Sequence, residues 1–277
     1  AAVLSLIGAF ASPVGQQLIA MYGWQTARAI MSIFTTVLSV VLTVLFVRKS
    51  PAVMGLLPVG AGHKPNETAV EKEEELTFED GATMEQARRS PDLYLLVLVA
   101  GIFVMCAAFF QQIPAFCART ELGAGAGAMA VSIMMVGGIV FKLVLGALND
   151  RIGVRWTGVI SATCGALGIF LAYIAGANVT VFYAGMVIFG GGYAGLTVIA
   201  PMLARESFGS LNYSQVYSWV STGIFIFTAI SFVVYGMIYD TTGSYDLCFV
   251  LVIAMYLIGV VLVPVTIAIS HKAWKRA

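Results

Sequence analysis

LYLLVLVAGIFVMCAAFFQQI, at residues 93–113, contains no charged side chain along its whole length. A run of about 20 apolar residues crosses a bilayer as an α-helix, because a helix satisfies its own backbone hydrogen bonds where water is absent. Several other stretches of the chain have the same length and character. The sequence therefore predicts an all-α, polytopic membrane protein with eight transmembrane helices, which we expect at residues 2–21, 26–47, 93–113, 126–148, 155–175, 179–203, 215–238 and 246–269.

The composition of the chain supports this class. Of the 277 residues, 60% are hydrophobic and 10% are charged, and the mean hydropathy is +0.93. A soluble domain carries about 25% charged residues, so a water-soluble globule and a disordered chain are both excluded. An outer-membrane barrel would show short alternating segments instead of long apolar runs. The net charge of +1, without a basic stripe, gives no support to nucleic-acid binding.

The reactive side chains do not form a recognisable catalytic or metal-binding pattern. The four cysteines show no CxxC or Cys/His spacing, so neither a metal site nor a disulfide framework is predicted. An enzyme inside the membrane would need a cluster of His, Asp or Cys side chains at one depth, and the predicted spans contain none. We therefore expect no cofactor, no metal and no enzymatic activity.

One junction between spans, residues 48–91, is much longer than the others and carries the acidic run EKEEE, which is typical of a solvated linker. Near its end, residues 82–90 are expected to form a short helix on the membrane surface, ended by Pro91. Six spans follow the loop, and six is the size of one half of many transporters. We therefore expect 1–47 to be the last two helices of an amino-terminal bundle whose first four are absent, and 92–277 to be a complete carboxy-terminal bundle.

Orientation follows from the positions of the 15 Lys and Arg residues. With the amino terminus inside, twelve lie on the cytoplasmic side, whereas Arg28 and Arg119 lie outside and Lys142 lies within a span. Cytoplasmic loops carry an excess of basic residues, so both termini and the long loop are predicted to be cytoplasmic. The expected location is the plasma (inner) membrane.

Three motifs resemble the major facilitator superfamily. GALNDRIGVR at 146–155 is similar to the family pattern G-x-x-x-D-R-x-G-R-R between its eighth and ninth helices, although Val154 replaces a basic residue. YGWQTA at 22–27 resembles the turn between the fifth and sixth helices. SPAVMGLLP at 50–58 resembles the central loop of carboxylate carriers related to the oxalate/formate antiporter and the monocarboxylate transporters. The resemblance implies alternating access and a small organic anion as substrate.

Lys142 is the Lys or Arg residue that falls within a predicted span. It lies about 9 Å from the end of that span at 1.5 Å per residue, where a cation costs about 2.5–3.5 kcal/mol on the insertion scale. Either the side chain snorkels to the cytoplasmic edge, or it serves a function. Its helical face also carries Gly138, Gly146 and Asn149, which favours a protein-facing position. The resemblance implies that this lysine attracts an anionic substrate.

Other polar side chains are weaker candidates for the substrate site. Helix packing is the simpler explanation for Tyr193, Trp219 and Thr222, whereas one of the two adjacent amides Gln111 and Gln112 either lines a cavity or lies at the outer interface. The absence of Lys from 215–238, where related antiporters carry one, favours a substrate with one negative charge. The triple glycine at 190–192 indicates either close helix packing or a flexible break. The candidates for substrate binding besides Lys142 are Gln111, Gln112, Tyr193, Trp219 and Thr222.

The turn that contains Asp150, Arg151, Gly153 and Arg155 has two interpretations. It is either a basic anchor that keeps the loop inside, or a cytoplasmic gate whose charges pair with a neighbouring helix end such as Glu206. Gly153 permits the tight turn. Exposed ion pairs contribute about 0–1 kcal/mol each, so a gate would need several of them.

Together these features predict a secondary transporter that moves a small organic anion, most simply a carboxylate, across the bilayer as a monomer. Proton symport and exchange for a counter-anion both stay open. The alternative is a non-transporting membrane scaffold or a truncated, inactive transporter fragment.

Overall fold

The computed structural model describes residues 2–46, 81–209 and 212–274, and within these ranges the chain forms helices joined by short turns. The prediction of an all-helical membrane protein is confirmed, since long apolar helices account for most of the described residues. Six helices in these ranges are long and apolar enough to cross a membrane: Pro13–Leu45, Pro91–Ala118, Ala124–Ile174, Val179–Phe208, Tyr213–Thr242 and Asp246–Ile269.

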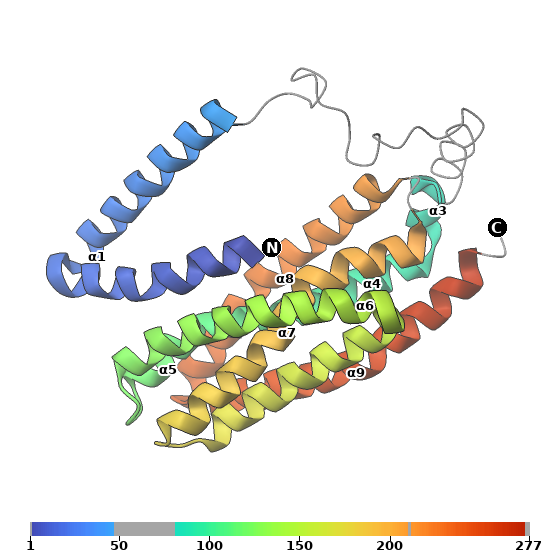
Figure 1. The fold of residues 1–277 in the computed structure, drawn as a ribbon. Coiled ribbons are helices and arrows are strands. Elements are labelled where there is room, and N and C mark those ends of the chain that lie inside the picture. Colours follow the sequence, from blue (N-terminus) through green and yellow to red (C-terminus); the bar gives the residue numbers. More distant parts are fainter. Residues whose placement is uncertain (1, 47–80, 210–211, 275–277) are drawn as a thin grey trace. The chain divides into compact units, whose positions relative to one another are not determined.

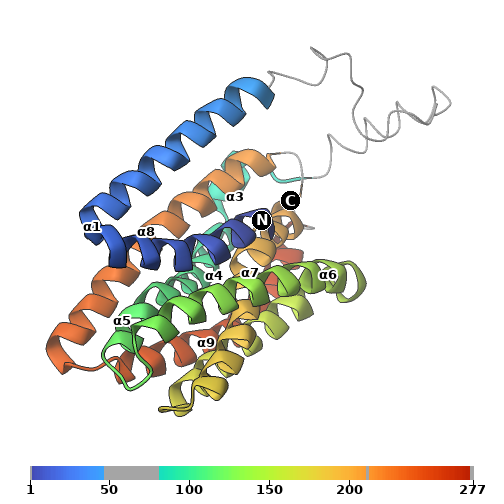
Figure 2. The same ribbon diagram turned by 60° about the vertical axis from the view of Figure 1, so that its left-hand side comes forward.

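Two of the long helices, α1 (Ala2–Phe46) and α6 (Ala124–Ile174), each cover two of the eight predicted spans. Each is interrupted by one glycine with a positive φ: Gly23 has φ 76° and ψ 162°, and Gly153 has φ 79° and ψ 166°. Residues with a side chain rarely adopt this conformation. Figures 1 and 2 show that α6 folds back on itself. Six spans are found by length and hydropathy, so the count of eight stays a prediction.

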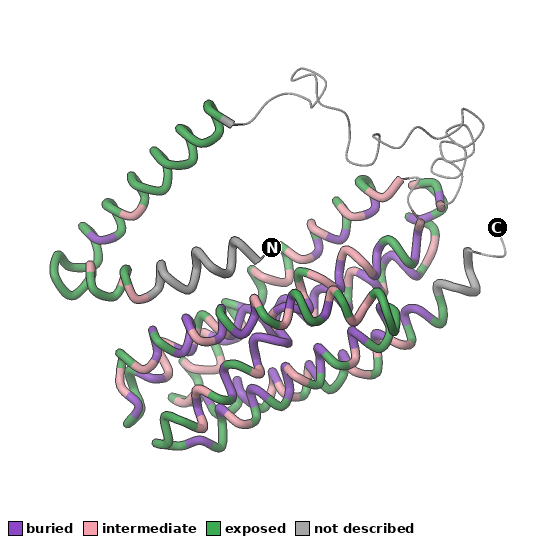
Figure 3. Tube along the Cα trace, in the orientation of Figure 1, coloured by how far each residue is buried: buried purple, intermediate pink, exposed green. Residues whose placement is uncertain are grey.

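The chain divides into two compact units. One unit is Val14–Glu79, in which the structure describes residues up to Phe46, and these are mostly exposed (Figure 3). The other unit is Ala1–Pro13 with Asp80–Ala277, and its described side chains build a packed core. Its helices after the long loop are α3 (Met84–Arg89), α4 (Pro91–Ala108), η2 (Phe109–Gln112), α5 (Ile113–Ala118), α6, α7 (Val179–Phe208), α8 (Tyr213–Thr242) and α9 (Asp246–Trp274).

The triple glycine of α7 allows this helix to approach the first arm of α6 very closely. A Cβ atom on Gly190 would lie 2.6 Å from the backbone nitrogen of Gly138 and 2.7 Å from the carbonyl oxygen of Met134. A Cβ on Gly192 would lie 2.5 Å from the Cα of Gly165, on the second arm of α6. Close approach of backbones at small residues is the usual way that membrane helices associate. Of the two interpretations of this motif, the structure supports close packing.

Aromatic side chains join η2, at the end of α4, with α8 and α9. The ring of Phe109 packs edge-on against Tyr235 at 5.4 Å and against Phe249 at 4.9 Å between centroids. The Tyr235 hydroxyl donates a hydrogen bond of 2.7 Å to the carbonyl of Met105. All of these rings are fully buried, so the cluster fixes three helices that are distant in sequence.

The end of the long loop is attached to the bundle. The backbone N–H of Ala82 donates to the Phe208 carbonyl at the end of α7 at 3.0 Å. Thr83 and Gln86 then form a reciprocal capping box at the start of α3, which satisfies two backbone donors. The short helix expected within residues 82–90 is thus present, and Pro91 begins the next helix.

At the opposite end of the unit, the turn after α5 meets the turn between α8 and α9. The Arg119 guanidinium donates to the Tyr245 hydroxyl at 3.2 Å and lies 4.4 Å from the centroid of the Tyr239 ring. Burial raises the pKa of Tyr245 above its ordinary value, and the neighbouring Arg119 charge acts in the opposite direction. These contacts link two turns that are 126 positions apart.

Candidate functional site

Lys142 and Tyr193, two of the side chains singled out in the sequence, lie together between α6 and α7. Lys142 is 7% exposed, and its Nζ lies 5.2 Å from the centroid of the Tyr193 ring. A cation over an aromatic face gains about 0.5–2 kcal/mol, with the larger values where water is excluded. Tyr193 lies halfway along the 30-residue α7, so this contact is distant from both ends of that helix.

On the helical face that carries Lys142, a neighbouring aromatic ring covers Gly138, whereas no described side chain covers Gly146. One turn before Lys142, a Cβ on Gly138 would lie 3.6 Å from the Tyr193 ring, which therefore covers this glycine. One turn after it, a Cβ on Gly146 would meet no described atom within 4 Å. The Tyr193 ring thus lies beside both the Lys142 ammonium and Gly138, whereas no described side chain covers Gly146.

A third element reaches the same ring. Phe110, in the 3₁₀ helix η2, packs edge-on against Tyr193 with centroids 5.6 Å apart. Its neighbours Gln111 and Gln112 are exposed and half-buried, respectively. The predicted span 93–113 therefore does not continue as a regular α-helix here, because η2 and α5 follow α4. This break brings Phe110 against the Tyr193 ring and places the two amides next to it in the chain.

Trp219 and Thr222 on α8 have contacts other than Lys142 in the described part of the chain. The Trp219 ring is 45% exposed and lies 5.0 Å from the Arg88 guanidinium carbon. The exposed Thr222 hydroxyl donates to the carbonyl of Ser218, one turn earlier in the same helix, at 2.9 Å. The structure groups Lys142 with Tyr193, and groups Trp219 with the end of the long loop.

The charged turn around Gly153 lies on the surface. Asp150, Arg151 and Arg155 are exposed, and the Arg155 guanidinium lies 5.7 Å from the ring of its neighbour Trp156. Within the described ranges, none of these three side chains forms an ion pair with Glu206. The positive φ of Gly153 explains the glycine at this turn.

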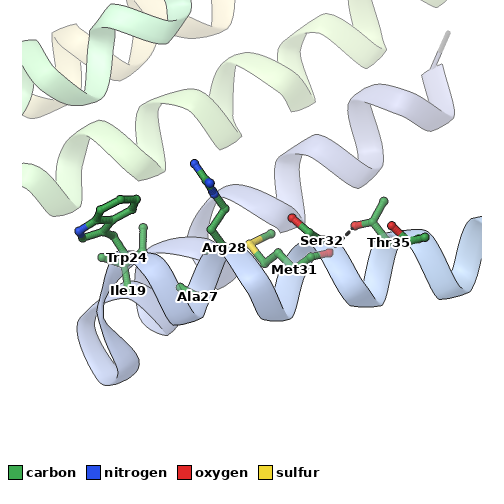
Figure 4. Close-up of a pocket in the computed structure, with 9 residues that line it drawn as sticks. Ile19, Trp24, Ala27, Arg28, Met31, Ser32 and Thr35 are labelled. Atoms are coloured by element: carbon green, nitrogen blue, oxygen red, sulfur yellow. Dashed lines mark hydrogen bonds between the residues drawn. The ribbon is translucent and has the colours of Figure 1, made fainter.

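A groove of about 600 Å³ lies in the hairpin that α1 forms around Gly23 (Figure 4). Trp24 and Arg28 project to the same side of it, with the guanidinium carbon 5.9 Å from the ring centroid. The Thr35 hydroxyl is bonded to the carbonyl of Met31 at 2.7 Å. The groove therefore presents one cation on a face of small polar and apolar side chains. Its lining is Gly15, Ile19, Trp24, Ala27, Arg28, Met31, Ser32, Thr35 and Thr36.

Sequence reasoning missed two features of the site region. The contact of Phe110 with Tyr193 could not be predicted, because Phe110 is one apolar residue among many in an apolar run. Asp92 is 3% exposed, and its Oδ1 atom is buried without a hydrogen-bond partner in the described structure. Its position in the first turn of α4, after the capping Ser90, is favourable for a carboxylate because of the helix dipole.

Within the described residues, no group of three or more His, Cys, Asp or Glu side chains is arranged to hold a metal ion. The Lys142 region contains a buried cation and two aromatic rings, a combination suited to binding an anion with an apolar part.

Comparison with known families gives one match. The model of the Major Facilitator Superfamily matches residues 114–275, which is more than half of the chain and includes α6, α7, α8 and α9 entirely. No individual curated protein matches the sequence.

Proposed function

Because the chain belongs to the Major Facilitator Superfamily, whose members are membrane transporters and not enzymes, we propose that it moves a small organic anion across the bilayer by alternating access. The matched segment contains four of the six candidate membrane spans and the Lys142 site. Membership of this family implies that the chain is an integral membrane protein with a small-molecule substrate. The anion, its carboxylate nature and the mechanism belong to the proposal.

The single observation that carries the proposal is the buried ammonium of Lys142 against the Tyr193 ring. A cation inside a membrane bundle is costly, so it persists where a function or a cavity compensates for it. One turn after Lys142, a Cβ on Gly146 would meet no described atom within 4 Å, so this part of the helical face is not covered by a described side chain. An anion bound there would gain more from the charge than it would at an exposed lysine, because the local dielectric constant is lower.

A monoanion with a small apolar part fits this site best. The sequence of α8 contains no Lys or Arg, so that helix does not supply a second positive charge. Tyr193 and Phe110 provide aromatic surface beside Lys142. A short monocarboxylate satisfies both features, in agreement with the resemblance to the oxalate/formate antiporter and monocarboxylate transporter group.

In this proposal the chain has eight spans, with the breaks at Gly23 and Gly153 as the turns within the two longest helices. Both termini and the long loop are cytoplasmic in the plasma (inner) membrane, and the protein acts as a monomer. The segments 1–47, 48–91 and 92–277 are the end of one bundle, the central loop and the second bundle. The exposed turn at 150–155 is a cytoplasmic gate, which pairs with Glu206 or another helix end in a closed state.

Uptake into proteoliposomes tests the proposal. Vesicles that contain the protein are loaded with unlabelled formate, acetate or lactate, and entry of the labelled anion is measured. Lys142→Gln should abolish uptake, and Lys142→Arg should retain part of it because the charge persists while its shape changes. Lys64→Gln removes the same charge from outside the predicted spans and serves as the matched control.

A comparison of empty vesicles with vesicles that contain an internal anion distinguishes the two coupling modes. Proton symport predicts uptake that is driven by an inward proton gradient into empty vesicles. Exchange predicts uptake that requires an internal anion and ignores the proton gradient. Uptake by Lys142→Gln with the kinetics of the unmodified protein would refute the assignment of the anion site.

A further inference from the structure

A cluster of cationic and aromatic side chains lies where α3, the start of α4 and the start of α8 meet. Figures 1 and 2 show α3 beside the first turns of α8 at one end of the bundle. One backbone hydrogen bond from Ala82 to Phe208 attaches the segment before α3, and Ala87 of α3 is fully buried. The cluster is therefore held by packing on both sides and is part of the folded unit.

Arg88 is the centre of this cluster. Its guanidinium carbon lies 5.0 Å from the centroid of the Trp219 ring on α8. The Tyr94 hydroxyl, from the first turn of α4, donates to the Arg88 carbonyl at 3.3 Å. Arg88 itself is exposed, so stacking on the indole orients the guanidinium while its N–H groups stay accessible.

The two aromatic rings of the cluster are themselves exposed. Tyr94 is 62% exposed and Trp219 is 45% exposed. Trp219 is the seventh residue of α8, about 9 Å along the helix at 1.5 Å per residue. Tyr94 is the fourth residue of α4, just where the apolar run of that helix begins. Tyr and Trp with an apolar body and a polar tip are enriched at this depth, where the hydrocarbon core meets the headgroups.

From this geometry we propose that Arg88, Trp219 and Tyr94 form a binding site for the phosphate headgroup of an anionic phospholipid. The guanidinium is a planar fork that can donate two parallel hydrogen bonds to phosphate oxygens. The rings of Tyr94 and Trp219 lie beside the upper acyl chain. The site holds the end of the long loop at the membrane surface through a lipid, in addition to its protein contacts.

The neighbouring charges set the strength of the site. Arg89 forms an ion pair with Glu85 at 2.7 Å, and both side chains are about 80% exposed. This carboxylate neutralises the second arginine and weakens the attraction for a lipid phosphate. Replacement of Glu85 by Gln releases Arg89, so the structure assigns opposite effects to Arg88→Gln and Glu85→Gln.

Quenching of Trp219 fluorescence by brominated lipids measures the site directly. The full chain carries Trp24→Phe, Trp156→Phe and Trp274→Phe, and is reconstituted in phosphatidylcholine with increasing brominated phosphatidylglycerol or brominated phosphatidylcholine. The ratio of the two quenching curves gives the relative affinity for the anionic lipid. One basic residue near a membrane surface is worth about a fivefold preference.

We expect Arg88→Gln to lower the preference about fivefold and Glu85→Gln to raise it by a similar factor. Arg28→Gln removes one exposed arginine from outside the cluster, and as the control for loss of a single surface charge it should leave the preference unchanged. Inorganic phosphate at millimolar concentration should not alter Trp219 quenching in phosphatidylcholine vesicles.

Equal quenching by the two lipids, or a preference that survives Arg88→Gln, would overturn the lipid site. A response of Trp219 to free phosphate without preference for phosphatidylglycerol would replace the lipid with a soluble anion and would also overturn it. If the three Trp substitutions prevent folding, native mass spectrometry of the unmodified chain and of Arg88→Gln decides the question. The Arg88→Gln variant must then retain less phosphatidylglycerol than the unmodified chain.

Discussion

Gly190→Ala should destabilise the protein, although alanine is the better helix former by about 0.8–1.0 kcal/mol. The added methyl group would lie 2.6 Å from the Gly138 nitrogen and 2.7 Å from the Met134 carbonyl oxygen. Non-bonded contacts are favourable at about 3.5–4.0 Å, so α6 and α7 must separate by about 1 Å. The atoms it meets belong to the backbone of α6 and cannot rotate away, unlike a flexible side chain.

Overpacking of this kind costs about 1–3 kcal/mol, which exceeds the gain in helix propensity. The net prediction is a loss of up to about 2 kcal/mol in the free energy of unfolding. The assay is equilibrium unfolding of the purified protein in mixed micelles with increasing denaturing detergent, followed by circular dichroism and by the fluorescence of the four tryptophans.

Gly236→Ala is the matched control, because it changes a glycine inside α8 whose added Cβ would meet no described atom within 4 Å. This variant should be as stable as the unmodified protein or more stable by up to about 1 kcal/mol. The reasoning is refuted if Gly190→Ala unfolds at the same detergent concentration as Gly236→Ala, since the close contact of α6 with α7 would then contribute nothing.

Three further changes have defined outcomes. Tyr235→Phe removes the buried hydrogen bond to the Met105 carbonyl and should lower the free energy of unfolding by about 1 kcal/mol, which the same detergent titration measures. Thr83→Ala breaks the reciprocal cap with Gln86 at a cost of about 1 kcal/mol, so limited proteolysis should cut faster near α3 while the spans stay protected. Gly153→Ala forces a side chain to φ 79° and should cost about 1–3 kcal/mol in the detergent titration. An unchanged value in any of these measurements would show that the corresponding hydrogen bond, helix cap or backbone conformation does not contribute to stability as proposed.

The general class of this protein could be predicted from sequence, because apolar runs of the right length and the charged turns between them are local signals. The family assignment was likewise carried by a local motif around Gly153, and the family match includes it. Lys142 stood out because a cation in an apolar run is rare in itself. The pairing of Lys142 with Tyr193 was not predictable, since the two are 51 positions apart and on different helices.

Other contacts between helices were not predictable from the sequence either, because they join residues that are far apart in the chain. Phe110 looks like any other apolar residue until its contact with Tyr193 is seen. Trp219 was one of the weaker candidates for substrate binding, and the position of Arg88 beside it depends on how the long loop returns to the bundle. The break of the third predicted span at η2 did have a local marker, because Pro114 at the start of α5 has no backbone N–H to donate to the carbonyl of Phe110 one turn earlier.

The most direct test of the central claim compares binding of a small monocarboxylate with binding of its neutral amide. Acetate and acetamide have nearly the same shape, so any preference for acetate reports a positive charge at the site. The purified chain should prefer acetate by about 30-fold, corresponding to about 2 kcal/mol for a desolvated charge pair. Lys142→Gln should bind the two compounds equally, and Lys142→Arg should keep a preference for acetate. A Lys142→Gln protein that still prefers acetate to the same extent would show that Lys142 is not the residue that recognises the anion.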